Sequence, residues 1–337
     1  MSKKRDFLSV LICLVVVSYL SVTAVFAQKK ALHMYTAFDV DQAKTYIEAF
    51  EKSHPNIDVK WVRLSSGEVL ARVRAEAAHP TASIWYAGSN PSHIAAAEDD
   101  LLEPYFSKYS WSLPLKFKDP QGRWVGIYTG FIGFVSNTNF LKKHGFKAPT
   151  SWQDLLSHVL KNEIAMAYAY TSGTAYTTLA TLVQLMGEDK AFEYVEKFNK
   201  QIHHYTKSVT ACINMVGLGE IAVGISFSHD IVAKGIGRGY QVVMTFPREG
   251  TGYEIGGMSL IKGGPEPELA KIFDDWALIP AAQNLYKKWF RVPLVPGAEV
   301  GEGTVTADQV NLIDYNAVWA GENKARLTER WREVTGQ

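Results

Sequence analysis

The first third of the chain alternates short apolar runs with polar turns and amphipathic segments. Apolar runs at residues 32–35, 58–64 and 83–87 predict three strands, and each run ends in a turn rich in small or hydroxyl residues. Apolar residues at helical spacing follow the first two turns, and Ser65 and Glu68 have the spacing of a capping box. An Ala-rich helix is expected behind the third strand. Three consecutive strand–turn–helix units predict an α/β layer with parallel strands.

The turns after these strands are the first place to expect a ligand. In a parallel sheet, ligands bind beyond the carboxyl ends of the strands. Thr36, the segment Ser65-Ser66-Gly67 and the segment Gly88-Ser89 follow three such ends. The pattern therefore predicts that these polar turns share one edge of the sheet.

The rest of the chain repeats the same alternation. A Gly-punctuated apolar run at 124–135 predicts a long strand, and further strands are expected at 164–170, 221–227 and 241–246. Helices are expected to open at Thr150-Ser151 and to occupy 188–203, 269–277 and 281–289. The repetition predicts a second α/β lobe similar to the first.

A polar turn at 171–174 runs directly into a helical pattern that ends before Gly187. Ser172, Gly173 and Thr174 would stand at the positive end of this helix, where unpaired N–H groups bind anions. The alternative is an ordinary N-cap, the commoner role of Ser and Thr at a helix start. No Arg clamp is evident nearby, and Lys207 is the basic residue expected within reach.

Three polar groups are conspicuous: His229-Asp230, Glu254 and the segment Tyr205-Thr206-Lys207-Ser208. The last follows a predicted helix end, and a solvated loop is its alternative. His229 and Asp230 follow the run I-A-V-G-I-S-F, and Glu254 lies among glycines. Each has a plain alternative, a surface loop for the first two and an exposed turn for Glu254. Carboxylates and an imidazole can bind sugar hydroxyls, whereas hydroxyls and helix N-termini suit a phosphate. Both sets together would fit a phosphorylated polyol.

No catalytic motif is present: the chain lacks G-x-S-x-G, H-E-x-x-H, C-x-x-C and Walker sequences. Ser228-His229-Asp230 has the letters of a triad, but neighbours on a strand would point to opposite faces. We therefore expect a binding protein and not an enzyme, without a cofactor or a structural metal.

The N-terminus predicts export. Basic residues at positions 3–5, an apolar run from Phe7 to about Leu20 and the sequence Val25-Phe26-Ala27 are typical of a signal peptide cleaved after Ala27. An uncleaved membrane anchor is the alternative. Cleavage removes three of 35 basic and one of 34 acidic residues, so the mature chain stays balanced and predicts no nucleic-acid partner. Only Cys212 remains, so no intrachain disulfide can form.

Several segments resemble the periplasmic solute-binding proteins of ABC importers. The resemblance rests on the segments M-Y-T-A-F, S-S-G-E-V-L-A-R-V-R-A-E, I-W-Y-A-G-S, G-I-Y-T-G-F-I-G-F-V-S-N-T and A-K-I-F-D-D-W-A-L-I-P-A-A-Q. It implies the two-lobed, hinged type II fold, in which a ligand closes the lobes and the closed form is recognised by a permease in the inner membrane. We expect a monomer with a signal peptide at 1–27, a discontinuous first lobe at 28–130 plus 257–337, and a second lobe at 131–256. Crossovers are expected near 128–135 and 252–258.

Within that family, the chain is similar to hexose-phosphate binders of the ferric-iron-binding subgroup in T-S-G-T-A-Y-T-T-L-A-T-L-V-Q-L-M-G-E-D, Y-T-K-S, G-I-S-F-S-H-D and E-G-T-G-Y-E-I-G-G. This similarity implies phosphate ligands at Ser65, Ser66, Gly67, Ser172, Gly173 and Thr174. It implies sugar ligands at Thr36, His229, Asp230 and Glu254. The iron binders usually carry adjacent tyrosines, and this chain has no Tyr-Tyr pair but His229-Asp230 at the expected place. Ferric iron and a phosphonate or other organophosphate are the alternative ligands.

Overall fold

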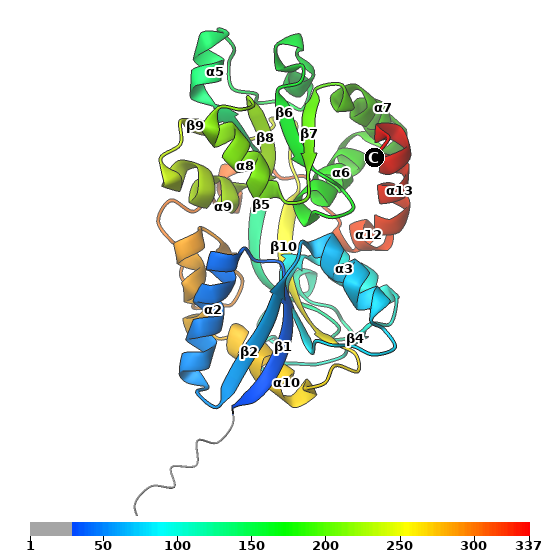
Figure 1. Cartoon of the computed structure of the whole chain (residues 1–337), viewed down its shortest axis with the longest axis vertical. Coiled ribbons are helices and arrows are strands. Elements are labelled where there is room, and N and C mark those ends of the chain that lie inside the picture. Colours follow the sequence, from blue (N-terminus) through cyan, green and yellow to red (C-terminus); the bar gives the residue numbers. More distant parts are fainter. Residues whose placement is uncertain (1–28) are drawn as a thin grey trace, which may run out of the picture.

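The computed structural model describes residues 29–337, so the predicted signal peptide at 1–27 lies outside the described residues. The lower lobe in Figure 1 begins with three parallel strands, in which the central β1 pairs with β2 and β3. The strands and the helices that follow them are β1 (Lys30–Thr36), α2 (Val40–Ser53), β2 (Ile57–Arg63), α3 (Ser66–Ala75), β3 (Ile84–Ser89) and α4 (Asn90–Glu98). The capping box at the start of α3 forms as predicted, with the Ser65 N–H donating to Glu68 Oε2 at 2.9 Å.

Two long antiparallel strands join the lobes. They are β5 (Val125–Asn137) and β10 (Tyr253–Ile261), which run side by side through the waist of the molecule (Figure 1). In the lower lobe β10 also pairs with β3, and in the upper lobe β5 pairs with β8 and β9. All residues of β5 are buried, which explains its near-continuous apolar sequence. The two crossovers predicted from the sequence lie on these strands.

The upper lobe has a second mixed layer, in which β6 runs parallel to β7 and to β8. Its strands are β6 (Ile164–Ala167), β7 (Ile202–Thr206), β8 (Val223–Phe227) and β9 (Val242–Thr245). Its helices are α5 (Thr138–Lys143), α6 (Gly173–Met186), α7 (Glu188–Asn199), α8 (Val209–Leu218) and α9 (Ser228–Asp230), which continues into a π-turn at Ile231–Gly235. The fold is therefore the α/β, two-lobed type II architecture that the sequence predicted.

The chain after β10 returns first to the lower lobe. The elements there are α10 (Pro267–Ala277), α11 (Pro280–Gln283), a 3₁₀ helix (Asn284–Trp289) and β11 (Val292–Pro293), with the short strand β4 (Leu102–Glu103) pairing β10. Further 3₁₀ turns are at Leu115–Phe117, Gln153–Leu156, His158–Leu160, Ile236–Arg238 and Ala307–Gln309. An aromatic cluster of Phe38, Tyr46, Tyr86 and Tyr286 fills the core of this lobe, with ring centroids 4.8–6.4 Å apart.

The last two helices, α12 (Ala317–Glu322) and α13 (Lys324–Thr335), link the lobes once more. In Figure 1, α13 lies beside α7 of the upper lobe. Trp331 packs edge-on against Tyr205 at 5.2 Å between ring centroids, and Arg330 pairs with Glu188 at 2.7 Å. We keep 28–130 plus 257–337 and 131–256 as proposed lobe boundaries, with α13 as the part of the first segment that packs on the second lobe.

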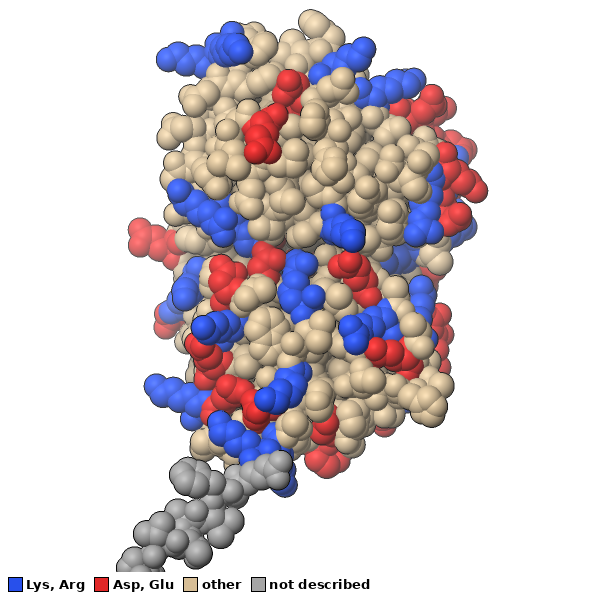
Figure 2. Space-filling model, viewed as in Figure 1, with Lys and Arg blue, Asp and Glu red and all other residues tan. Residues whose placement is uncertain are grey.

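Several elements differ from the sequence-based expectation. The helix expected from Thr150 is reduced to short 3₁₀ turns, and the helix expected to reach residue 203 ends at Asn199. Ile202 has helical spacing from Phe198, but it begins β7 because pairing with β6 satisfies its backbone. The helices α8, α12 and α13 were not predicted. No helix within residues 29–337 has the length and apolarity needed to cross a bilayer. On the face shown in Figure 2, basic and acidic side chains are intermixed.

Candidate ligand-binding site

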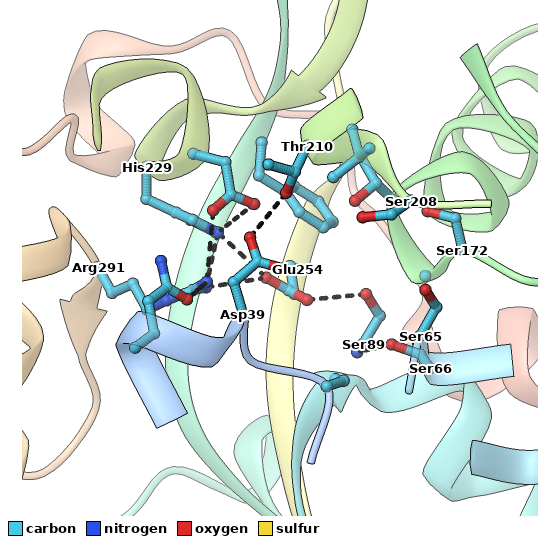
Figure 3. A pocket seen from close by; sticks show the side chains of 18 of the residues that line it. Asp39, Ser65, Ser66, Ser89, Ser172, Ser208, Thr210, His229, Glu254 and Arg291 are labelled. Carbon is cyan, nitrogen blue, oxygen red and sulfur yellow. Dashed lines mark hydrogen bonds and ion pairs between the residues drawn. The ribbon is translucent and has the colours of Figure 1, made fainter. Parts of the chain in front are cut away.

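A polar cavity of about 50 Å³ lies between the lobes, beside the crossover strands. The polar turns after β1, β2 and β3 meet there, as the shared-edge argument predicted: Asp39, Ser65 and Ser89 all line it. The upper lobe contributes the turn before α6 and the segment after β8. Figure 3 shows hydroxyl side chains toward one end of this cavity and His229 and Arg291 toward the other.

Within residues 29–337, five helices of nine or more residues begin at this cavity. Their N-cap residues line it, and these are Asp39 of α2, Ser65 of α3, Ser89 of α4, Ser172 of α6 and Ser208 of α8. Each helix start carries N–H groups without intrahelical partners and a partial positive charge. The cap side chains of α2, α4 and α8 make no hydrogen bond to their own helices. The five positive ends together create a strong preference for an anion.

The predicted phosphate residues are brought together from both lobes, with one exception. Ser65, Ser66, Ser172, Gly173 and Thr174 line the cavity. Ser172 Oγ also accepts a hydrogen bond from the Ala175 N–H at 3.4 Å. Ser172 therefore caps α6 and lines the cavity at the same time.

Gly67 and Thr36 are not among the lining residues. The Gly67 N–H donates to the Thr171 carbonyl at 2.8 Å, which joins α3 to the upper lobe. A Cβ at Gly67 would lie 2.0 Å from the Tyr170 carbonyl oxygen, so only glycine permits this approach. Thr36 is fully buried, and its Oγ1 accepts from the Phe38 N–H at 3.2 Å. Their assignment as ligand residues stays a prediction.

Two basic side chains that the sequence analysis did not identify line the cavity: Arg63 at the hydroxyl end, and Lys234, whose Nζ lies 3.3 Å from Asp230 Oδ1 of the opposite end. The Asp39 carboxylate accepts from Arg63 Nη2 at 2.9 Å and from Thr210 Oγ1 at 2.7 Å, and it forms an ion pair with Lys234. Lys234 and Thr210 belong to the upper lobe, so this cluster bridges the cleft. Burial and the nearby Arg291 lower the pKa of Lys234 well below its usual value. Lys207, by contrast, is exposed and supplies only its backbone carbonyl, which accepts from Ser65 Oγ at 3.3 Å.

The opposite end is organised by Arg291, which the sequence analysis also missed. It precedes β11, is 4% exposed, and its guanidinium carbon lies 4.2 Å from the centroid of the Tyr128 ring. Its Nη1 lies 2.6 Å from His229 Nε2, and its Nη2 donates to Gln42 Oε1 at 3.1 Å. Burial, together with the charge of Arg291, lowers the pKa of His229 to about 4. The imidazole is therefore neutral at pH 7, and its Nε2 accepts the bond from Arg291.

Two buried carboxyls complete this end. Burial raises the pKa of Glu254 to about 7 against the opposing effects of Arg291 and Ser89, and Ser89 Oγ donates to Glu254 Oε1 at 2.8 Å. Burial alone would also raise the pKa of Asp230, but His229 and Arg291 lower it below its usual value. One carboxyl is thus ionised and the other close to half-protonated at neutral pH, so the pair can both accept and donate hydrogen bonds.

Several buried polar atoms at this end have no hydrogen-bond partner among the described residues. They are Gln42 Nε2, His229 Nδ1, Asp230 Oδ1, Glu254 Oε2 and Arg291 Nε. Arg291 faces the two carboxyls only at ion-pair distance, 3.6 Å to Asp230 and 3.7 Å to Glu254. Buried polar atoms are rarely left without partners in proteins, so this concentration marks a place for a polar ligand. The predicted residues His229, Asp230 and Glu254 all belong to it.

Tyr128 is the phenol that lines the cavity, and burial raises its pKa well above 10. A buried phenol of this kind favours hydrogen bonding over the phenolate form that ferric iron prefers. Within residues 29–337, no group of three or more His, Cys, Asp and Glu side chains has the arrangement of a metal site.

Comparison with known proteins identified a matching family model, one related sequence and two similar structures. A family model described as bacterial extracellular solute-binding protein matches residues 79–318. An uncharacterized protein of Haemophilus influenzae is 35% identical over 298 residues, or 86% of each chain. The structure of the periplasmic binding protein AfuA from Actinobacillus pleuropneumoniae, with exogenous fructose-6-phosphate bound, is similar with 34% identity and a TM-score of 0.88, covering 91% of this chain and 99% of AfuA. The periplasmic binding protein P5PA is similar with 30% identity and a TM-score of 0.87, covering 91% and 100%.

Proposed function

The chain belongs to the family of bacterial extracellular solute-binding proteins, and from this premise we propose that it captures a phosphorylated sugar of the hexose-phosphate class. It is the solute-binding component of an ABC importer and not an enzyme. Capture takes place in the cavity between the lobes, and the loaded protein then delivers the sugar phosphate to a permease in the inner membrane. The fructose-6-phosphate bound to AfuA supports this ligand class.

The observation that carries the proposal is the division of the cavity into two chemically different ends. One end collects five helix N-termini with Arg63, which suits a phosphate. The other end holds His229, Asp230 and Glu254 around Arg291, with unpaired polar atoms that suit hydroxyl groups. A phosphorylated sugar presents both kinds of group in one molecule.

Ser65, Ser66, Ser172, Gly173 and Thr174 are the proposed phosphate ligands of this site. Gly67 supports them by allowing α3 to approach the turn at 170–171. Each helix-end or hydroxyl contact contributes about 0.3–2 kcal/mol, and micromolar binding needs about 8 kcal/mol. Several contacts must therefore act together, with charge supplied by Arg63.

His229, Asp230 and Glu254 are the proposed ligands of the sugar hydroxyls. Thr36 acts on this end through the backbone of Phe38, whose N–H its hydroxyl binds. Phe38 also lies 5.0 Å beneath the guanidinium of Arg291, which faces the carboxyls.

The lobes must separate for such a ligand to enter. Ligand sites for small molecules have volumes of roughly 300–1,000 Å³, whereas the cavity measures about 50 Å³. Contacts that cross the cleft, such as Asp39 with Lys234 and Gly67 with Thr171, hold this compact form. A ligand that touches both lobes replaces part of these contacts and stabilises its own closed form. That closed form is the state offered to the permease, after export and cleavage of the signal peptide behind Ala27.

Titration calorimetry on the mature protein tests this proposal with fructose 6-phosphate, fructose, inorganic phosphate, 2-aminoethylphosphonate and ferric citrate. We expect fructose 6-phosphate to bind tightly and fructose and phosphate at least tenfold more weakly, since each reaches only one end of the cavity. Ligand at a hundred times its dissociation constant should also add about 2.7 kcal/mol to the free energy of unfolding.

Two variants test the phosphate end and the sugar end of the cavity separately. Ser172→Ala should weaken fructose 6-phosphate severalfold, because one hydroxyl among several phosphate contacts is lost. Asp230→Asn should weaken it more and leave inorganic phosphate unaffected. Asp308→Asn, at a fully exposed site, is the control. Binding of ferric citrate or the phosphonate in preference to sugar phosphates would overturn the ligand class while leaving the family intact.

A further inference from the structure

A second cavity lies in the lower lobe and shares no lining residue with the cleft. It has a volume of about 300 Å³, which is within the range of small-molecule sites. Its walls come from the segment 105–125, which carries the aromatic rings of Tyr105, Phe106, Trp111 and Trp124. Trp111 is 75% exposed and Phe106 is 59% exposed, so the mouth of the cavity is apolar and open to solvent.

One carboxyl faces this cavity from helix α10. Asp274 lines it, is 4% exposed, and receives no hydrogen bond from any group of the described residues. Its neighbours are engaged elsewhere: Asp275 Oδ1 accepts from Ser107 Oγ at 2.5 Å, and Asp119 is bound by Arg123 at 2.8 Å. A buried carboxyl without a partner is costly, so Asp274 is a group that a ligand can satisfy.

The surroundings of Asp274 are electronegative. Burial and the nearby acidic groups Asp275, Asp274 and Glu268 together raise the pKa of Tyr105 to about 12. The cation that lines the cavity, Lys118, donates to the carbonyls of Ser110 and Trp111 at 2.9 and 3.2 Å. Lys118 is thus held by backbone carbonyls, so a positive group entering the cavity could pair with Asp274 once that carboxyl is ionised.

We propose that this cavity binds a small organic ammonium ion with an apolar body. The ammonium group would pair with the Asp274 carboxylate, and the apolar body would lie against Trp111 and Trp124. Aromatic walls favour such cations, because the ring faces attract positive charge. Two rings of the same segment already contact cations. The ammonium group of Lys108 lies 5.0 Å from the ring centroid of Tyr109, and that of Lys116 lies 5.0 Å from the ring centroid of Phe117.

The buried carboxyl also gives the site a pH signature. Burial and the charge of Asp275 raise the pKa of Asp274 well above its usual value, so without a cation the group holds its proton. A bound ammonium ion stabilises the carboxylate and displaces that proton to solvent. The affinity for the cation should therefore rise with pH, whereas a neutral ligand of the same shape has no such dependence.

The test compares 2-phenylethylammonium with 2-phenylethanol, a neutral molecule of similar shape, on the full mature protein. Titration calorimetry and tryptophan fluorescence should show one bound cation, held about tenfold more tightly than the alcohol and more tightly at higher pH. Asp274→Asn should abolish the preference for the cation. Glu48→Gln, an exposed change on α2 of the same lobe, should leave it unchanged.

Trp111→Ala removes an exposed wall without touching the core and should weaken both probes severalfold, so the proposal stays testable if Asp274→Asn does not fold. Saturating fructose 6-phosphate should not compete with the cation, because the cavities are separate; this outcome is independent of the ligand proposed for the cleft. No binding of the cation, equal affinity for the alcohol, or competition by the sugar phosphate would each overturn the proposal.

Discussion

Arg291 shows how one residue sets the chemistry of the cleft. It lies between two carboxyls and an imidazole, and its guanidinium stacks on Tyr128. The sequence around it, W-F-R-V-P, has no feature that distinguishes it from a surface arginine. Its role depends on β11 pairing with β5, which places it beneath the waist of the molecule. Such long-range placement is why residue patterns predicted the carboxyls and the imidazole but not their cation.

Glu254 should make stability depend on pH. Its pKa is about 7 in the folded protein against 4.5 in the reference state, so the native state retains its proton between these values. The stabilising contribution of the protonated group is complete below pH 4.5 and is lost as the pH rises through about 7. His229 has the opposite effect: its pKa falls from 6.5 to about 4, so its contribution is complete above pH 6.5 and is lost toward pH 4.

We therefore expect the two effects to offset one another in the wild-type protein. In Glu254→Gln only the effect of His229 remains. The wild type loses the contribution of Glu254 as the pH rises from 4.5 to 7, so the variant should gain stability relative to the wild type over this range. The steepest gain is about 1.4 kcal/mol per pH unit. Urea unfolding over this pH range measures the difference, with Glu268→Gln as an exposed control. Parallel pH profiles for Glu254→Gln and wild type would show that Glu254 is not buried as described.

At the scale of elements, the closed cleft depends on how near α3 can come to the turn before α6. The Gly67 N–H reaches the Thr171 carbonyl across the lobes, and there is no room for a Cβ. Gly67→Ala should therefore obstruct closure and weaken fructose 6-phosphate at least tenfold, with little effect on the folding of either lobe.

Calorimetry measures that loss of affinity, and small-angle X-ray scattering should show an enlarged radius of gyration with ligand present. Ala71→Ser, on the exposed side of the same helix, is the control. Unchanged affinity together with an unchanged radius would mean that the contact does not limit closure.

Much of the element order could be predicted from the sequence. Apolar spacing and turn residues predicted the first three strand–helix units, a long strand at the place of β5 and the start of α6. The two crossovers were implied by the family resemblance. The misses have physical causes. The strand β7, I-H-H-Y-T, lacks an apolar run because its middle residues are exposed. Helix α8, V-T-A-C-I-N-M-V-G-L, is apolar on most of its circumference, so its period is weak. The missed start of α8 also hid Thr210, which lines the cavity, whereas Ser208 belongs to the segment Y-T-K-S that the resemblance had included.

At the scale of the molecule, the candidate site is a consequence of the joint between the lobes. Two continuous strands cross it, and neither lobe alone holds a complete set of ligand groups: Arg63 and Arg291 come from one side, His229 and Lys234 from the other. The sequence predicted residues on both sides of the joint. The ion pairs across it depend on side-chain packing that no local pattern encodes.

The position of α13 makes it possible to follow movement of the lobes by energy transfer between the two ends of the chain. The described chain starts in β1 of the lower lobe and ends beside α7 of the upper one (Figure 1), so its two ends lie on the two lobes whose relative movement we propose. Donor and acceptor dyes at residues 30 and 337 should change their energy transfer as fructose 6-phosphate is added. A pair at 30 and 262, both in the lower lobe, should not. Constant transfer between the ends at saturation would contradict lobe movement. Energy transfer between the two ends would thus report the fraction of the protein that has ligand bound in the cleft.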